Sequence, residues 1–191
     1  MIEKFGEVLK KTCENLERRG PNIESRKMNP RFESKLNYDP IYRDGGQHLP
    51  KNDGKWSGSR GNSTWIPDRD KIPSGRATNY EGQSWGKILD NHKIDGISFK
   101  DGEPDFRPIA KETVRIDNFT ERRSKNFLQA DEKAAKKLNC SPEDIRKLRQ
   151  EHGYTWHERR DCRTMDLVPS EVHNNIPHSG GISEKKLNRS A

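Results

Sequence analysis

The sequence has few cysteines and no long apolar run. Its three cysteines form no CxxC pair and no other short spacing, so they predict neither a disulfide framework nor a thiolate zinc site. No apolar stretch approaches the roughly 20 residues that span a bilayer, so we expect no membrane span. Charged residues run through the first twenty positions, unlike a classical signal peptide. If the protein is exported, we expect a signal outside this chain or a specialised delivery system.

Apolar residues are scarce as well. They make up 28% of the chain and charged residues 35%, whereas an average globular chain is roughly 45–50% apolar, so the core must be small. At roughly 150 residues per domain, the 191 residues favour one domain with an N-terminal arm. The net charge of +7 and the pI near 9.3 favour binding to a polyanion such as nucleic acid, and equally to an acidic protein partner.

The N-terminal part divides into a helix and a loop-rich stretch. Apolar residues recur at steps of three and four over residues 2–16, which predicts an amphipathic helix ending at Gly20-Pro21. This helix packs on its own domain or binds a secretion adaptor, and the sequence leaves both open. Residues 22–80 are crowded with turn-forming residues. They also contain the aromatic residues Tyr38, Tyr42, Trp56 and Trp65, so we expect this stretch to lie ordered against the rest.

Short elements are expected in the middle of the chain. Trp85, Ile88 and Leu89 predict a short helix that closes near Asn91. Two Asp-Gly pairs flank an apolar stretch at residues 94–102, which is typical of a strand between turns. Residues 113–116 predict another strand. The sequence therefore predicts three parts of the chain: an N-terminal helix at 1–20, a loop-rich extension at 21–125 packed on the core, and a catalytic part at 126–191.

A helical hairpin should begin the catalytic part. Residues 126–138 are rich in helix formers and stop at Asn139. Ser141 then supplies an N-cap and Pro142 a first helical residue for a second helix that ends at Gly153. The hairpin is mostly scaffold, and three of its residues are candidates for binding nucleic-acid phosphates: Arg146, Lys147 and Arg149.

The C-terminal region concentrates histidine. Four of the six histidines follow residue 150: His152, His157, His173 and His178. Residues 154–158 and 164–169 have the aromatic and β-branched composition of strands, and Pro169 stops the second. Residues 170–174 can open a short helix with Ser170 as the cap. The predicted order is therefore strand, strand, helix.

This order can carry the chemistry of phosphodiester hydrolysis. The reaction needs a base to activate water, a cation to offset charge in the transition state and a proton source for the leaving oxygen. His157 or Glu158 would end the first strand, and His173 and His178 offer imidazole nitrogens suited to a first-row divalent ion. The five-residue spacing with Pro177 between the latter two places the second ligand in a loop beyond the helix. Gly180 and Gly181 allow a tight fold there.

The stretch from Tyr154 to Gly181 reads YTWHExxDxxTMxLVPxxVHxxIxHxGG in this chain. It resembles the HNH/endonuclease VII nucleases with a Trp-His-His signature that are found at the C-termini of bacterial polymorphic toxins. The resemblance implies an α+β fold with a ββα-metal (HNH-like) nuclease core near the C-terminus, preceded by helices and a loop-rich N-terminal extension. It also implies a divalent ion as cofactor, and zinc, magnesium, manganese and nickel all remain open.

By this resemblance His157 is the first active-site histidine, and His173 and His178 bind the ion. Asp161 also matches the pattern and is carried as a catalytic candidate. The third signature position is Glu158 instead of His. Either Glu158 is the general base, or His157 is the base and the ion keeps two protein ligands. We favour His157, because imidazole titrates near neutrality, and we expect it to be an exposed side chain at the end of the strand.

Two earlier segments, residues 61–68 and 94–106, also look like stretches that accompany this nuclease in toxins. Packing around the nuclease, or recognition by an immunity protein, is the expected role.

The resemblance implies a toxin domain that is delivered by a specialised system, cuts DNA with little sequence preference in the target bacterial cytoplasm, and is neutralised by an immunity protein. One alternative is an RNase on the same centre. Another is a non-catalytic module that binds nucleic acid or protein and holds a structural zinc.

Overall fold

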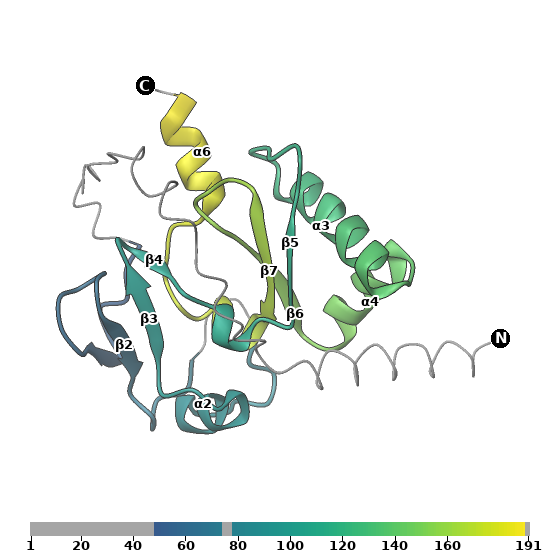
Figure 1. The fold of residues 1–191 in the computed structure, drawn as a ribbon. Coiled ribbons are helices and arrows are strands. Elements are labelled where there is room, and N and C mark those ends of the chain that lie inside the picture. Colours follow the sequence, from purple (N-terminus) through teal and green to yellow (C-terminus); the bar gives the residue numbers. More distant parts are fainter. Residues whose placement is uncertain (1–47, 74–77, 190–191) are drawn as a thin grey trace, which may run out of the picture.

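A computed structural model describes residues 48–73 and 78–189 of the chain (Figure 1). The described part is a mixture of short strands and helices. In chain order the elements are β1 (Gly54–Trp56), β2 (Thr64–Pro67), α2 (Trp85–His92), β3 (Ile97–Lys100), β4 (Glu103–Pro104), the 3-10 turn η3 (Arg107–Ile109), β5 (Glu112–Arg115), α3 (Arg123–Leu138), α4 (Pro142–Glu151), β6 (Tyr154–Glu158), β7 (Thr164–Pro169), α5 (Ser170–His173) and α6 (Gly181–Arg189).

The strands form two antiparallel sheets. The first has the order β1-β2-β3-β4, and the second has the order β5-β7-β6, with β7 in the centre. Val114 of β5 pairs with Met165 of β7, and Asp166 of β7 pairs with His157 of β6. β5 precedes residue 125, so the boundary predicted after that residue separates β5 from the two strands with which it forms the second sheet. The three-part division stays a prediction.

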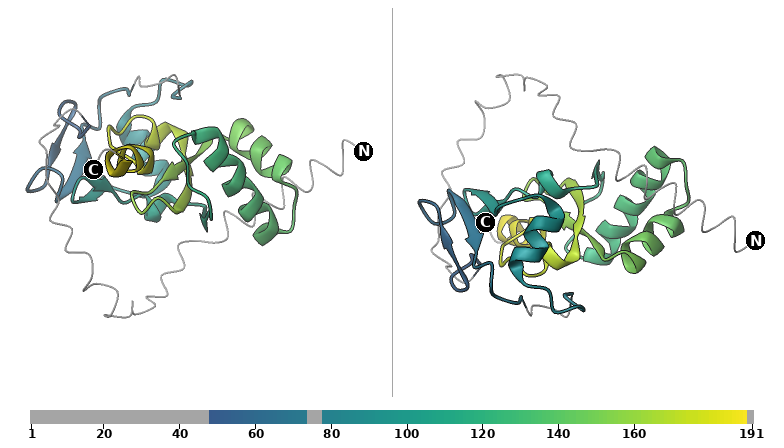
Figure 2. Two further views of the ribbon diagram at one scale, coloured as in Figure 1. Left: turned by 90° about the horizontal axis from the view of Figure 1, so that it is seen from above. Right: turned by 90° about the horizontal axis from the view of Figure 1, so that it is seen from below.

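The β5-β7-β6 sheet lies between two layers (Figure 2). Side chains alternate between the faces of a strand, so Trp156, Met165 and Leu167 pack with α3 and α4 on one face. Val168 packs on the opposite face, where the first sheet, α2 and α5 provide a second core around Trp65, Ile88 and Phe106. The second sheet therefore separates a helical core from a core built by the first sheet.

The predicted helical hairpin is confirmed in its details. Asn139 ends α3 in the left-handed conformation. The Ser141 side chain accepts a hydrogen bond from the amide of Asp144, whose carboxylate accepts one from the amide of Ser141 in return. Such a capping box satisfies amides that a helix start leaves unpaired. The end of α3 and the start of α4 are thus fixed by residues that the sequence analysis identified.

Other expectations need correction or lie outside the described residues. Residues 54–56 and 64–67 form strands within the stretch expected to be loops, because the Trp56 ring contacts those of Trp65 and Phe99 at tilted and edge-on angles. Ser170 does not cap α5: the N-cap is Pro169, and no side chain bonds to this one-turn helix start. The predicted helix at 2–16 lies outside the described residues, as do the aromatic residues Tyr38 and Tyr42. Among the helices of residues 48–73 and 78–189, none has the length and apolarity to cross a membrane.

Candidate metal centre

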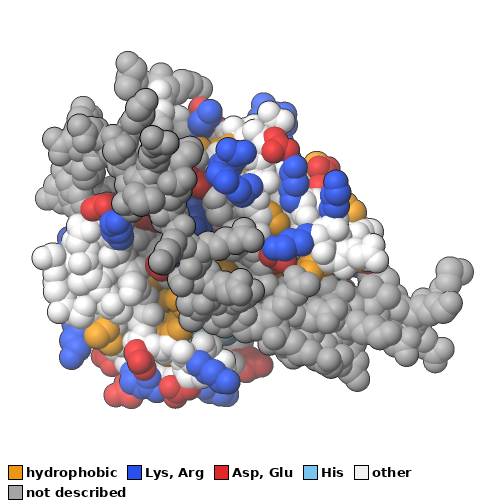
Figure 3. Space-filling view, viewed as in Figure 1, with side chains coloured by type: hydrophobic (Ala, Val, Ile, Leu, Met, Phe, Trp, Pro, Cys, Tyr) orange, Lys and Arg blue, Asp and Glu red, His pale blue; other side chains and the backbone are white. Residues whose placement is uncertain are grey.

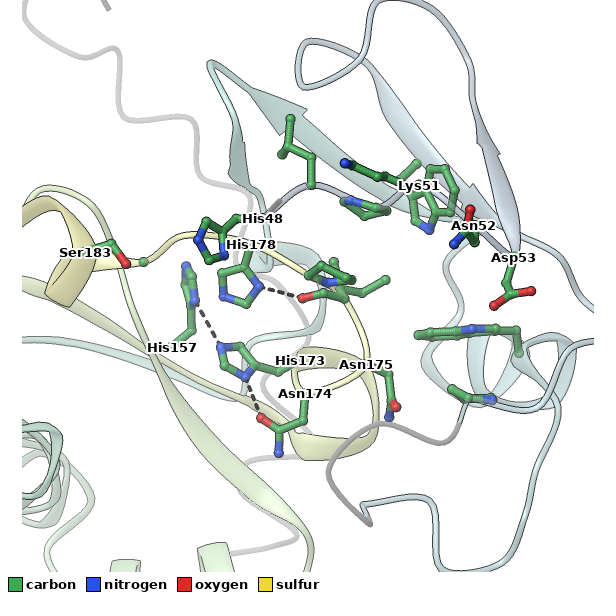
Figure 4. A pocket seen from close by; sticks show the side chains of 18 of the residues that line it. His48, Lys51, Asn52, Asp53, His157, His173, Asn174, Asn175, His178 and Ser183 are labelled. Carbon is green, nitrogen blue, oxygen red and sulfur yellow. Dashed lines mark hydrogen bonds between the residues drawn. The ribbon is translucent and has the colours of Figure 1, made fainter. Parts of the chain in front are cut away.

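Three histidines converge on the face of the second sheet that packs against the core of the first sheet. His157 projects from β6, His173 ends α5, and His178 comes from the loop beyond α5. Each offers one ring nitrogen, and these atoms all lie within 4.8 Å of one another. Figure 4 shows the three rings turned toward a common point. The loop position expected for His178 is therefore confirmed, and the three imidazoles form a candidate metal centre.

Hydrogen bonds at the outer ring nitrogens fix two of the rings. His178 Nδ1 lies 2.7 Å from the Ile176 carbonyl oxygen, which can only accept, so this nitrogen carries the proton and Nε2 of the neutral ring has a lone pair. His173 Nδ1 lies 3.0 Å from Asn174 Oδ1. Metal-binding histidines normally donate their second N–H in this way, which orients the ring. His173 Nε2 in turn faces His157 Nδ1 at 3.2 Å.

His157 holds an orphaned buried nitrogen. The residue is 1% exposed. Among the described residues, its Nε2 is the buried side-chain nitrogen or oxygen atom that has no hydrogen-bond partner. Leaving such a group unpaired costs about 1–3 kcal/mol. Desolvation lowers the pKa of His157 well below its usual value, and the neighbouring His178 and His173 lower it further. Imidazole must be neutral to bind a metal, so this donor set fits a divalent cation.

Phe106 forms a wall of the centre. Its ring centroid lies 4.9 Å from that of His157, 5.3 Å from His173 and 5.4 Å from His178, and the side chain is 1% exposed. The segment 94–106 therefore packs against the site, which confirms the packing role expected for it. The sequence did not single out Phe106, because a lone aromatic residue next to a turn carries no sign of which rings it will contact.

The histidines border an open pocket of about 780 Å³ (Figure 4). This volume is in the range of sites that bind organic ligands and far exceeds the roughly 30 Å³ that one water occupies. Lys51, Lys71 and Arg123 also line it. His48 is a fourth pocket imidazole, which Figure 4 places beside His178. Sequence reasoning missed His48 because it is isolated in a loop-rich stretch.

Glu158 lines the same pocket, but its carboxylate is turned away from the imidazole cluster toward α3. It is 4% exposed and accepts a hydrogen bond of 2.8 Å from Asn126 Nδ2 and one of 3.3 Å from Arg123 Nε. His157 is also buried, so the expectation that it is an exposed strand-end side chain is wrong. Because it lies between Phe106 and two other rings, its loss would disturb the packing.

Other candidate residues lie outside the pocket. Asp161 is exposed in the β6–β7 turn, where its carboxylate accepts bonds from the amides of Arg163 and Thr164. Arg149 is paired with buried Asp131, and Arg146 with Glu143. Lys147 is half-buried on α4. Figure 3 shows basic and acidic side chains mixed over α3, α4 and β5. Phosphate binding by α4 stays a prediction.

Gly180 and Gly181 are required for a different reason from the one expected. Neither has a positive φ. A Cβ on Gly180 would lie 2.9 Å from the Glu158 carbonyl oxygen, and one on Gly181 would overlap the Arg159 carbonyl oxygen and the Phe119 ring. The glycines therefore let the segment after His178 pass close to the end of β6, which brings His178 toward His157.

The fold and the cluster define a small mixed α/β module with an imidazole centre in an open, partly basic pocket. Residues 96–180 match a family model described as the DNase/tRNase domain of colicin-like bacteriocins. This range contains β3 to α5 and all three clustered histidines. The match supports a nuclease toxin domain of the bacteriocin type. A search of the curated proteins found no match.

Proposed function

We propose that this chain carries a metal-dependent HNH-type endonuclease that acts as a bacterial toxin. The observation that carries the proposal is the convergence of His157, His173 and His178 within 4.8 Å, inside the segment that matches the nuclease family. The order β6, β7, α5 around these residues supports a ββα-metal core. The net charge of +7 favours a polyanionic substrate.

All three histidines would hold the ion. This departs from the assignment of His157 as base, because its unpaired Nε2 and its contact with His173 favour a ligand role. A bound divalent ion supplies a Lewis acid that offsets charge on the phosphate and lowers the pKa of water. Three protein ligands leave room for solvent and substrate, as in catalytic sites, whereas structural zinc sites normally close with four.

The substrate is proposed to be DNA. Hydrolysis adds water across a P–O bond of the backbone: the attacking water loses a proton, and the leaving oxygen gains one. His48 and Glu158 are pocket side chains able to accept a proton. The family description covers both DNase and tRNase, so RNA is the second candidate. Neutralisation by an immunity protein, and delivery into the target cytoplasm with or without an adaptor, belong to the same proposal.

The test is incubation of purified protein with plasmid and with tRNA, across zinc, magnesium, manganese and nickel, with and without chelator. We expect metal-dependent nicking and linearisation of plasmid. The double variant His173→Ala/His178→Ala should lose cleavage and metal content. His152→Ala, which changes an exposed histidine at the end of α4, is the matched control. Cleavage of tRNA alone would favour the RNase, and metal binding without any cleavage would favour the structural module.

A further inference from the structure

Arg123 is a pocket cation outside the histidine cluster. It is the first residue of α3 and lines the same pocket as the three histidines. Its side chain is 55% exposed, so part of the guanidinium faces solvent. The first turn of α3 contains no acidic residue, and the described residues provide one ion-pair partner for Arg123, which is Glu158.

Glu158 is placed to hold Arg123 and not to reach the ion. Neighbouring residues of a strand project to opposite faces, so the His157 side chain enters the cluster while Glu158 turns to α3. There Glu158 Oε1 accepts from Asn126 Nδ2 at 2.8 Å, and Oε2 accepts from Arg123 Nε at 3.3 Å. Asn126 is itself locked, because its Oδ1 accepts from the Thr120 amide and its Nδ2 donates to the Thr120 carbonyl oxygen. The carboxylate therefore has a fixed position.

We propose that Arg123 binds the phosphate of the nucleic-acid backbone beside the histidine centre, and that Glu158 is the residue that positions Arg123. This inference rests on the proposed nuclease function and deepens it. Glu158 engages only the Nε of the guanidinium, and a guanidinium has five N–H donors in a planar fork. The remaining donors can bind two phosphate oxygens, the bidentate geometry for which arginine is suited.

The other arginines considered from the sequence are less suited to this role. Arg149 is 12% exposed and its guanidinium donates to both carboxylate oxygens of Asp131. Arg146 donates to both oxygens of Glu143 and also to Gln150. Neither residue lines the pocket. Arg123 combines a half-exposed side chain with a place in the pocket that the three histidines line.

The first test measures binding without catalysis. A fluorescent DNA duplex is titrated with protein in excess chelator at several salt concentrations. We expect Arg123→Ala to raise the dissociation constant about tenfold at low salt, and to reduce the slope of log K against log salt by about 0.9, the loss of one phosphate contact. Lys125→Ala removes the same charge from an exposed residue two positions further along α3 that does not line the pocket, so it is the matched control.

The second test measures turnover with saturating metal. Arg123→Ala should lower kcat about 100-fold, the size expected for a lost charge-stabilising donor, with unchanged metal affinity. Arg123→Lys should recover part of the loss, because lysine keeps the charge without the fork. Glu158→Gln should lower kcat about tenfold in the parent and have no further effect in the Arg123→Ala background, because the two residues act as one unit.

Different outcomes separate the two proposals. If the parent cuts no nucleic acid with any metal, the proposed function fails, while the chelator titration still decides whether Arg123 binds phosphate. Equal effects of Arg123→Ala and Lys125→Ala on binding would overturn the role of Arg123. A large loss from Glu158→Gln in both backgrounds would overturn the positioning role and identify Glu158 as the base. Circular dichroism of each variant establishes that it is folded.

Discussion

Phe106 is the residue that joins the candidate centre to the core of the protein. Its ring contacts all three imidazoles on one side and belongs to the core formed by the first sheet, α2 and α5. The histidine rings are therefore held by packing as well as by their hydrogen bonds. This arrangement limits the movement of the three imidazole rings.

We expect Phe106→Ala to lower the free energy of unfolding by about 3–5 kcal/mol, because it leaves a cavity at a fully buried site. Metal affinity should fall as well, since the rings lose their common wall. Chemical denaturation and calorimetric metal titration measure both effects. Phe106→Leu retains most of the volume and should lose less of each. Parent-like metal affinity in the alanine variant would mean that packing by Phe106 does not organise the site.

The buried imidazole of His157 predicts a pH dependence for the metal-free protein. Burial holds its pKa well below the usual value of 6.5, so on acidification the unfolded chain takes up a proton while the folded His157 does not. The stability present above pH 6.5 is therefore lost as the pH falls toward the lowered pKa, at no more than about 1.4 kcal/mol per pH unit. Denaturation in chelator between pH 7.5 and 5 measures the slope. His157→Asn should flatten it, and identical slopes would contradict the account.

At the scale of elements, the helical hairpin supports β6 through one buried carboxylate. Asp131 of α3 accepts hydrogen bonds from Arg149 of α4 and from the indole N–H of Trp156, the residue before His157. Asp131 is 3% exposed. A single side chain thus ties both helices to the strand that carries a candidate ligand.

We expect Asp131→Ala to lower the free energy of unfolding by about 3–5 kcal/mol, because it leaves Arg149 as an uncompensated buried charge. The measurement is equilibrium unfolding in denaturant. Asp117→Ala removes a carboxylate whose ion pair with Lys133 is exposed, so it should cost far less. Similar losses in the two variants would contradict a special role for the buried network.

The segment that follows His178 makes a further prediction at this scale. Gly181→Ala should displace the start of α6, because the new methyl group would overlap the Arg159 carbonyl oxygen and the Phe119 ring. We expect weaker metal binding together with lower thermal stability. Asn188→Ala changes an exposed residue further along α6 and serves as the control. Unchanged metal affinity in Gly181→Ala would show that the loop tolerates the shift.

The elements of the C-terminal half could be predicted because their signals are local. Asn139, Ser141 and Pro142 mark helix ends by their own conformational preferences, and the composition of 154–158 and 164–169 indicates strands. In the first sheet, β1 and β2 were missed because they are three and four residues long and are stabilised by contacts with distant residues such as Phe99. Long-range packing of this kind leaves no period in a short sequence window.

The sequence predicted which histidines form the candidate site, but not their surroundings. Histidine spacing and the resemblance pointed to residues 157, 173 and 178, which the fold brings together. The burial of His157, the wall made by Phe106, and the pocket positions of His48 and Arg123 depend on how β6 meets the rest of the molecule. Sequence alone could not indicate that Glu158 turns toward α3, because its partners lie more than thirty positions away.

At the scale of the whole molecule, the second sheet has a core on each face, with the histidines on the face shared with the first sheet. The hairpin packs on one face of the sheet that contains β6 (Figures 1 and 2), while α5 and the loop after it carry two of the three clustered histidines. Residues 96–180, which match the nuclease family model, contain the elements that carry the three clustered histidines. Residues 48–53 and 71–73, which precede the matched range, add one side of the pocket.

We infer that His157, His173 and His178 together bind one divalent ion. Calorimetric titration of metal-stripped protein with zinc tests it most directly. We expect one ion per chain, and a loss of affinity of at least tenfold when any one of the three is replaced by asparagine. No binding by the parent, or parent-like affinity in the three variants, would contradict it.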